Sequence, residues 1–291
     1  MTTSALEIRG LEKSFPRFKL GPIDITVPAG GIYGLIGPNG AGKTTTIDLI
    51  LGIGSYDAGH IKVMGMNPKE QEIAVKSRLG YVSPDLNFNL WRNVGRLITF
   101  VRQYYPDWDD IYCRHLLKRM NIAWEDEIKT VSFGTRVKLA LVIALSHKPD
   151  LLLLDEPTLG VDAVSKREIF SELLSAVQDE RRAVLIASHG LSDLERFADH
   201  IGIIHRGQIL LEDSTASILD RFRIIDITYN GTALPPIFSK AYIKEHSDDR
   251  WRLLIEYQNG LEAQLQSMGI QQLASSAVNL EDLFITMVRE D

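Results

Sequence analysis

The chain has 291 residues, of which 45% are hydrophobic, enough for one large or two modest domains with a sizeable core. Its formal net charge of −6 and its lack of basic clusters exclude the electrostatic footprint of proteins that bind nucleic acids or anionic membranes. The single cysteine, Cys113, excludes an internal disulfide, and no Cys/His cluster has the spacing of a zinc site.

The N-terminal segment has no signal-peptide pattern, and no run approaches the roughly 18 apolar residues that cross a bilayer. Any path across a membrane is therefore expected to come from another chain, and the single cysteine fits a reducing cytoplasm. Alternating polar and apolar residues over 6–9 and 23–27 predict two strands of a sheet with one exposed face. The apolar run 31–36 predicts a further strand, and a helix is expected over 45–51.

Between that strand and that helix lies a glycine-rich loop with the spacing of a phosphate-binding loop. Its glycines let backbone N–H groups point at phosphate oxygens, and the helix N-terminus adds a partial positive charge. Lys43 is expected to reach the β- and γ-phosphates of a nucleotide, and the Thr44 hydroxyl to bind Mg²⁺. A glycine-rich turn that binds nothing is the alternative. The predicted nucleotide-binding residues of this segment are Gly37, Pro38, Asn39, Gly40, Ala41, Gly42, Lys43, Thr44 and Thr45.

The middle of the chain changes from a predicted strand at 60–64 to a helical, aromatic-rich pattern between residues 90 and 120. We interpret most of these aromatic side chains as core residues, and a partner-docking surface on a helical insertion is the alternative. The aromatic residues are Trp91, Phe100, Tyr104, Tyr105 and Trp108.

Ser132 is a good N-cap for the next predicted helix, which carries an apolar stripe at helical spacing from 137 to 145. A capped helix N-terminus beside Gly134 is a candidate anion site, and an ordinary helix cap is the alternative.

The apolar run 151–154 is too short for a helix and predicts a strand buried in a parallel sheet. It ends in Asp155 and Glu156, at the end of a strand where open α/β sheets bind ligands. Asp155 is expected to hold Mg²⁺ through water, and Glu156 to polarise the attacking water as a general base. A solvated acidic loop is the alternative.

Further strands are predicted at 183–187 and, as a hairpin, at 201–204 and 208–211. After about residue 220 the chain shows no catalytic motif. Strands at 223–229 and 251–257 and a helix at 280–288, capped by Asn279, predict a small α+β appendage with an interaction or regulatory role.

Taken together, these motifs resemble the ATP-binding subunits of ATP-binding-cassette (ABC) transporters, over roughly residues 5–215. Residues 37–44 match the Walker A motif, and 151–156 match Walker B with its catalytic glutamate. The segment 132–135 stands where the signature motif belongs. Asp162 matches the D-loop, His189 the switch histidine, and Phe15 the aromatic residue that stacks on adenine. For His189 a local hydrogen bond, and for Phe15 plain core packing, are the alternatives.

The resemblance implies an α/β fold: a P-loop NTPase (ABC ATPase) core with an antiparallel β subdomain and a helical subdomain, followed by a small C-terminal α+β extension. We expect the ATP-binding domain over 1–220, with the helical subdomain at about 86–148, and an accessory or regulatory domain over 221–291.

The resemblance also implies a dimer with a second copy or a paralogue. Each ATP would lie between the Walker motifs of one chain and the signature helix of the other. There Ser132 and Gly134 would meet the γ-phosphate, and His189 would orient the water held by Glu156. The partner would be an integral membrane permease at the inner face of the cell membrane, and neither nucleic acid nor zinc is expected.

Two positions depart from the family pattern. In the segment 80–85, Pro84 stands where the family usually has a glutamine that contacts Mg²⁺ and relays the nucleotide state to the permease. Asp85 could replace that ligand, or water could fill its position. Phe133 replaces the first glycine of the signature motif.

The segments 105–109, 146–149 and 187–189 and the C-terminal extension resemble the separate-chain ATPases of bacterial drug, antibiotic and peptide exporters. The alternatives are a soluble ABC ATPase that acts in regulation or on nucleic acid or ribosomes, a P-loop kinase or GTPase-like switch, and an interaction protein with an inactive cassette. The substrate is not encoded here, because the permease selects it.

Overall fold

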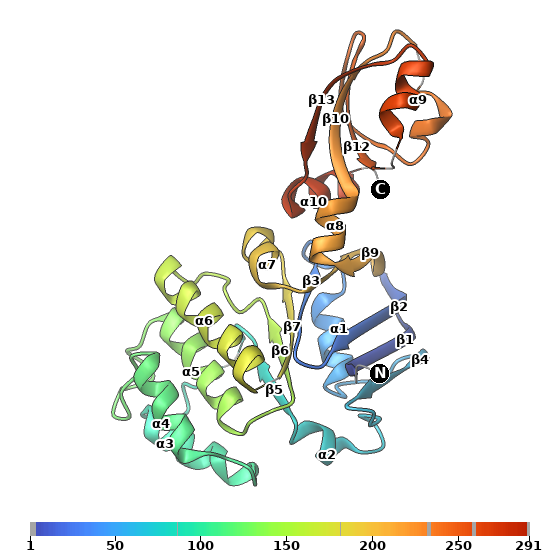
Figure 1. Cartoon of the computed structure of the whole chain (residues 1–291). Helices are drawn as coiled ribbons and strands as arrows, with labels where there is room; N and C mark the ends of the chain where they lie inside the picture. The colour runs from blue at the N-terminus through green and yellow to red at the C-terminus, as the bar shows by residue number, and fades with distance from the viewer. Residues whose placement is uncertain (1–3, 86, 181, 232–233, 258–259, 290–291) are drawn as a thin grey trace. The chain divides into compact units, whose positions relative to one another are not determined.

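The computed structural model describes residues 4–85, 87–180, 182–231, 234–257 and 260–289. It divides into two compact units (Figure 1). The first comprises Met1–Gly190 and Phe197–Glu212, and the second comprises Leu191–Arg196 and Asp213–Asp291.

A six-stranded sheet forms the centre of the first unit, with the strand order β5-β6-β7-β3-β8-β9. The strands from β5 to β8 are parallel. Their carboxyl ends therefore meet along one edge, where ligands bind in open α/β sheets. The strands are β3 (Ile32–Ile36), β5 (Leu79–Val82), β6 (Leu151–Asp155), β7 (Ala183–Ser188), β8 (His200–His205) and β9 (Gln208–Ser214).

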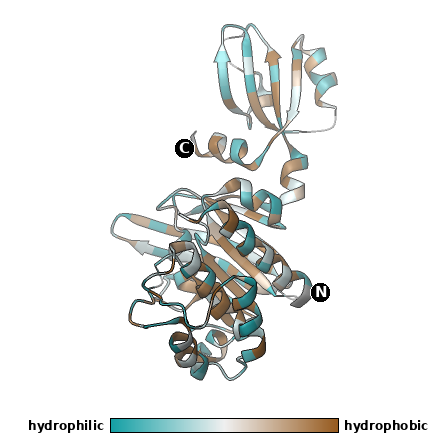
Figure 2. Ribbon diagram, turned by 90° about the vertical axis from the view of Figure 1, so that its left-hand side faces the viewer, coloured by the Kyte–Doolittle hydropathy of each residue, from teal (hydrophilic) through white to brown (hydrophobic). Residues whose placement is uncertain are grey.

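A second, antiparallel sheet has the order β2-β1-β4, from β1 (Ser4–Phe15), β2 (Phe18–Pro28) and β4 (Ala58–Val63). Its buried side chains share one core with the central sheet and with α1 (Lys43–Ile50). Strand β6 illustrates the packing, since all five of its residues are buried and Leu151 and Leu153 belong to this core. The interior strands are accordingly brown, that is hydrophobic, in Figure 2.

Helices cover both faces of the central sheet (Figure 1). On one face α1 contacts β6 and β7, and on the other α5 (Phe133–Ser146) contacts β5 and α6 (Ala163–Glu180) contacts β7. Short helices complete the unit: α2 (Glu72–Lys76), α3 (Val94–Val101), the 3-10 turn η1 (Arg102–Tyr104) and α4 (Asp110–Arg119). The predicted α/β P-loop fold is confirmed.

The aromatic side chains between residues 90 and 108 do not form the core, and our prediction for them was wrong. On α3 the buried face consists of Val94, Leu97 and Ile98, at helical spacing. Phe100 and Tyr104 lie off that stripe and are 41% and 67% exposed. They pack on each other, with ring centroids 5.2 Å apart, and the remaining three aromatic residues are only partly buried.

The second unit is an antiparallel sheet of order β11-β12-β10-β13. Its element sequence has the β-α-β-β-α-β order of ferredoxin-like units, with a 3-10 turn in place of the first helix. The elements are α7 (Leu191–Phe197), which continues one residue into the first unit, α8 (Thr215–Arg221), β10 (Phe222–Thr228), η2 (Pro236–Phe238), β11 (Tyr242–Ser247), β12 (Arg250–Glu256), α9 (Leu261–Ser267), β13 (Gln271–Ala277) and α10 (Leu280–Arg289).

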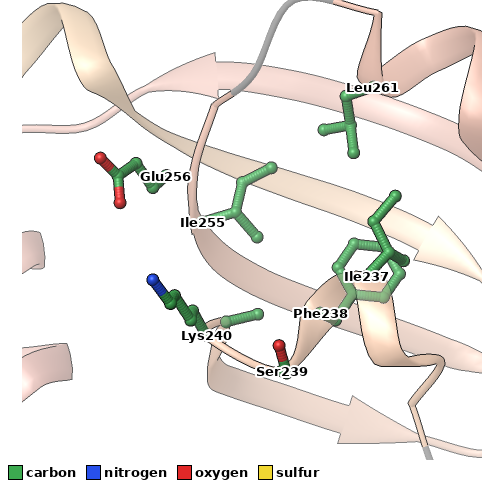
Figure 3. A pocket seen from close by; sticks show the side chains of 8 residues that line it. Ile237, Phe238, Ser239, Lys240, Ile255, Glu256 and Leu261 are labelled. Carbon is green, nitrogen blue, oxygen red and sulfur yellow. The ribbon is translucent and has the colours of Figure 1, made fainter.

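Because η2 is only one turn long, it covers less of the sheet than a helix would. A hollow of about 220 Å³ remains beside it, over the buried side chains of Phe238, Ile255 and Leu261 (Figure 3). The predicted cap of the last helix is confirmed, since Asn279 Oδ1 accepts a hydrogen bond from the N–H of Asp282 at 2.7 Å.

Candidate functional site

The loop after β3 wraps the start of α1 as the spacing of its glycines predicts. Gly42 has φ +112°, and a Cβ there would lie 2.8 Å from Leu20 Cδ1. A Cβ on Gly37 would lie 2.3 Å from the carbonyl oxygen of Ile204. Both positions therefore require glycine. Helix α1 begins at Lys43, so its free N–H groups face the loop.

Lys43 is buried and reaches across the loop. Its Nζ donates hydrogen bonds to the carbonyl oxygens of Gly37 at 2.7 Å and Pro38 at 3.2 Å. The same ammonium lies 3.3 Å from Glu156 Oε1, an ion pair between two buried or nearly buried groups. One cation thus joins the phosphate-binding loop to the acidic end of β6.

Asp155, at the end of β6, is bound to the helix that follows the loop. Thr44 Oγ1 donates to Asp155 Oδ2 at 2.7 Å, whereas Oδ1 is buried without a hydrogen-bond partner. Burial raises the pKa of this carboxyl, the Thr44 bond lowers it in part, and the neighbouring Glu156 raises it. A buried carboxylate with a free oxygen beside a hydroxyl suits a hard cation.

The described residues include no cluster of three or more His, Cys, Asp or Glu side chains suited to a metal. Mg²⁺ needs none, because it keeps several waters and is commonly held by one or two protein groups and by substrate phosphates. The pair formed by Thr44 and Asp155 therefore fits Mg²⁺ and does not fit a fully protein-coordinated metal.

Glu156 is held from the end of β7. His189 Nδ1 lies 2.8 Å from Glu156 Oε2, and the His189 N–H donates to the same oxygen at 3.3 Å. Ser188 Oγ donates to it at 3.2 Å. The sequence analysis did not identify Ser188, although its position next to the predicted histidine was a usable signal. The neighbouring ends of β6 and β7 thus bring Glu156 and His189 together, beside the ammonium group of Lys43.

Ser132 and Gly134 lie at the N-terminus of α5. Ser132 Oγ accepts a hydrogen bond from the N–H of Thr135 at 3.1 Å, so the predicted cap is confirmed. Asp162 is close by, since a Cβ on Gly134 would lie 3.4 Å from Asp162 Oδ2. Asp162 also caps α6, a role that the sequence analysis missed, by accepting from the N–H groups of Val164 and Ser165. Those bonds lower the pKa of its carboxyl.

In the described part of the chain, no hydrogen bond or ion pair connects Ser132, Gly134 or Asp162 to the phosphate-binding loop. Apart from Phe15 and Asp85, the predicted site residues therefore form two groups, one around Lys43 and Glu156 and one around the N-terminus of α5.

Phe15 lies at the tip of the β1–β2 hairpin, paired with Phe18. It is 41% exposed, so core packing does not explain it. The Phe18 ring lies against the phosphate-binding loop, because a Cβ on Gly42 would lie 3.1 Å from its Cζ. Phe18 was not predicted as a site residue, because its pairing with Phe15 is seen only in the structure.

Asp85 is exposed, and its described hydrogen bond is from its backbone N–H to Ser83 Oγ at 3.2 Å. Ser83 is buried and directly follows Val82, which pairs with Leu154 in the parallel register of β5 and β6. Continuing that register sets Ser83 beside Asp155. The sequence analysis considered Pro84 and Asp85 in this segment and overlooked Ser83.

This fold and this arrangement of loop, lysine, threonine and acidic strand end define a P-loop nucleotide-hydrolysing protein. Comparisons with known proteins identify its family. Residues 20–159 match the family described as ABC transporter. The chain is 32% identical over 216 residues to the ABC transporter ATP-binding protein YtrB of Bacillus subtilis, across 74% of this chain and 72% of that protein.

A second relative, the bacitracin transport ATP-binding protein BcrA of Bacillus licheniformis, is 32% identical over 221 residues, which cover 72% of this chain and 68% of BcrA. A solved ATP-binding subunit of an ABC transporter shares the fold, with a TM-score of 0.67 at 22% identity over 74% of this chain and 92% of that chain.

The chain belongs to the family of ABC transporter ATP-binding proteins, and it binds and hydrolyses ATP as the ATPase subunit of such a transporter. Among its described residues, no helix is both long enough and apolar enough to cross a membrane.

Proposed function

We propose that this ATPase works as a dimer in which each ATP is bound by the phosphate-binding loop of one copy and the N-terminus of α5 of the other. Lys43 binds the β- and γ-phosphates, and Phe15 stacks on the adenine. Glu156 takes a proton from the attacking water, and His189 orients that water and the γ-phosphate. The observation that carries this proposal is the contact of Glu156 with both Lys43 and His189.

Mg²⁺ would be held by Thr44 and Asp155, and its chemistry is to neutralise charge on the phosphates. The free, buried Oδ1 of Asp155 supports this assignment. Beside the bound nucleotide, Lys43 holds one carboxylate oxygen of Glu156, and His189 and Ser188 hold the other.

The second copy is supported by the exposed surface around α5 and α6. Phe133, Leu159 and Val164 are apolar and are 38%, 47% and 69% exposed. They lie close to Ser132 and Asp162 in the chain, and the ring of Phe133 is 3.6 Å from the position of a Cβ on Gly160. Apolar groups gathered beside a capped helix N-terminus suit a protein interface that also receives an anion.

The Glu156→Gln variant tests this proposal. Glutamine keeps the size and hydrogen bonding of the side chain but cannot act as a base, so we expect hydrolysis to fall at least about 100-fold while ATP still binds. Gel filtration with Mg-ATP should then show an accumulated dimer. Lys43→Ala is the control, since it should lose ATP affinity instead. A Glu156→Gln chain that remains monomeric and hydrolyses ATP at the native rate would contradict the proposal.

The membrane permease is proposed to dock in an apolar groove of the first unit. The groove encloses about 380 Å³ between the end of α1, β5 and α5. Tyr105 and His147 stack at its side with ring centroids 4.0 Å apart, and Ile53 on its rim is 56% exposed. A short amphipathic helix on the cytoplasmic side of the permease fits such a groove. Through it the ATPase would be peripheral at the inner membrane face.

Membranes carrying the permease test this docking. Wild-type chain should sediment with them, and Ile53→Asp, which sets a charge on the apolar rim, should not. Ile73→Asp is the matched control, since Ile73 is 87% exposed but lies outside the groove. Equal sedimentation of both variants would refute docking of the permease in this groove.

By analogy with BcrA, whose name specifies bacitracin transport, we propose that the transporter is an exporter.

A further inference from the structure

A very short connection joins His189 to the second compact unit. His189 contacts Glu156 through its N–H and its Nδ1, and α7 begins at Leu191. Residues Leu191–Arg196 of α7 belong to the second unit, whereas residues up to Gly190 belong to the first. Only Gly190 therefore separates the histidine of the ATPase site from a helix of the C-terminal unit.

Within the second unit, α7 is fixed by its Glu195. Glu195 Oε2 accepts a hydrogen bond from the backbone N–H of Leu280 at 2.8 Å, and Leu280 is the first residue of α10. That N–H has no carbonyl partner inside its own helix, so a side chain from elsewhere must satisfy it. A carboxylate is well suited, because it also interacts favourably with the helix dipole.

Helix α10 is in turn fixed to the sheet of the same unit. Lys244 on β11 forms an ion pair with Asp282 at 2.6 Å, and Leu280 and Leu283 are fully buried. A shift of α10 against β11 therefore displaces the N–H to which Glu195 is bonded. The contacts run without interruption from β11 through α10 to α7, and the backbone continues from α7 to His189.

We propose that Glu195 is a positioning residue for ATP hydrolysis. Its bond to α10 limits the motion of α7 and, through the single residue Gly190, the motion of His189, so the C-terminal unit affects the hydrolysis rate. This inference rests on the function proposed above, because it requires His189 and Glu156 to act on ATP. The physical reason is orientation: a small displacement of a group that aligns the reacting water costs a large factor in rate.

Glu195→Ala tests the anchor, and Asn279→Ala is its matched control. Both substitutions remove a side-chain acceptor from the N-terminus of α10, but the side chain of Asn279 accepts from the N–H of Asp282, and Asn279 is not on α7. We expect kcat to fall roughly 3- to 30-fold in Glu195→Ala with the KM for ATP unchanged. Asn279→Ala should keep the native kcat. Glu195→Gln retains an acceptor oxygen and should restore most of the rate.

A second variant covers the case in which Glu195→Ala does not fold. One extra glycine inserted after Gly190 leaves the bond between Glu195 and Leu280 intact and loosens only the link to His189. It should lower kcat to the same extent. Amide hydrogen exchange of residues 189–197, measured without ATP, should rise in Glu195→Ala and stay native in Asn279→Ala.

The outcomes separate the two proposals. A native kcat in both Glu195→Ala and the insertion variant, or an equal loss in Asn279→Ala, would overturn the role of Glu195. An unaffected rate in Glu156→Gln would instead count against the catalytic assignment. The exchange measurement decides whether α7 is anchored without depending on hydrolysis.

Discussion

At the scale of single residues, the backbone of Glu156 is the least expected feature of the site. Its φ is +46°, in the left-handed region that residues with a Cβ rarely adopt. Its N–H is held by the carbonyl of Ala187 at 2.8 Å, and its carbonyl accepts from the N–H of Leu159. These bonds offset the strain and direct the carboxylate at Lys43 and His189. Sequence patterns do not encode such a conformation, because they register residue type and not φ.

Asp85 and Ser83 give a prediction at this scale. Asp85 is exposed, whereas Ser83 is buried and beside Asp155 in the sheet register. We expect Asp85→Ala to leave the Mg²⁺ dependence of hydrolysis unchanged. Ser83→Ala, which removes a hydroxyl beside Asp155, should raise the Mg²⁺ concentration required by about threefold. ATPase rates measured against Mg²⁺ concentration check this. A raised requirement in Asp85→Ala alone would instead assign Asp85 as the substitute for the missing glutamine.

At the scale of elements, the strands of the first unit other than β5 and the capped helices α5 and α10 followed from sequence, because strand periodicity and N-cap chemistry are local. The run 151–154 needed only its apolar residues and flanking prolines to be recognised as β6. The aromatic residues of α3 and η1 could not be placed in this way. Whether Phe100 faces a core depends on which helix packs against α3, and that is a property of the tertiary structure.

The contact between α4 and α6 supplies a prediction at this scale. Arg119 Nη2 lies 2.7 Å from Oε1 of Glu172, a carboxyl that is only 5% exposed. Burial raises the pKa of Glu172, and Arg119 lowers it in part. Arg119→Ala should destabilise the chain by about 1–3 kcal/mol near neutral pH, because the buried carboxylate of Glu172 then lacks its partner. The loss is not larger because Arg119 itself is partly exposed.

The loss of stability in Arg119→Ala should be smaller at low pH than near neutral pH. Without Arg119 the folded-state pKa of Glu172 rises further above the unfolded value, so the folded chain binds a proton that the unfolded chain does not. Stability then falls as the pH rises through that folded pKa, and the deficit shrinks at lower pH. Urea unfolding at about pH 7.5 and about pH 5 measures it. Arg119→Ala with Glu172→Gln should remove the pH dependence, and a deficit that grows toward low pH would contradict the argument.

At the scale of the whole molecule, the order of motifs predicted the family but not the C-terminal unit's architecture. The strands at 223–229 and 251–257 were recognisable, yet their pairing brings distant segments together, and periodicity carries no information on that. The assignment of most of α7 to the second unit was equally beyond local patterns, since α7 lies within residues 1–220, the segment predicted as the ATP-binding domain. That assignment is what connects the appendage to His189.

The last prediction concerns the composite site of the proposed dimer. Lys43→Ala disables the phosphate-binding loop, and Ser132→Arg sets a long cation at the exposed N-terminus of α5, so each variant alone should be inactive. In a mixed dimer, the loop of the Ser132→Arg copy faces the intact α5 of the Lys43→Ala copy, which restores one site. An equal mixture should therefore recover about a quarter of the native rate, since half the dimers are mixed and each mixed dimer has one working site of two.

A mixture of Lys43→Ala with Glu156→Gln is the control and should stay inactive. Both changes lie on the same side of the site, so no mixed dimer contains an intact site. Recovery in both mixtures, or in neither, would exclude a homodimer with sites shared between copies.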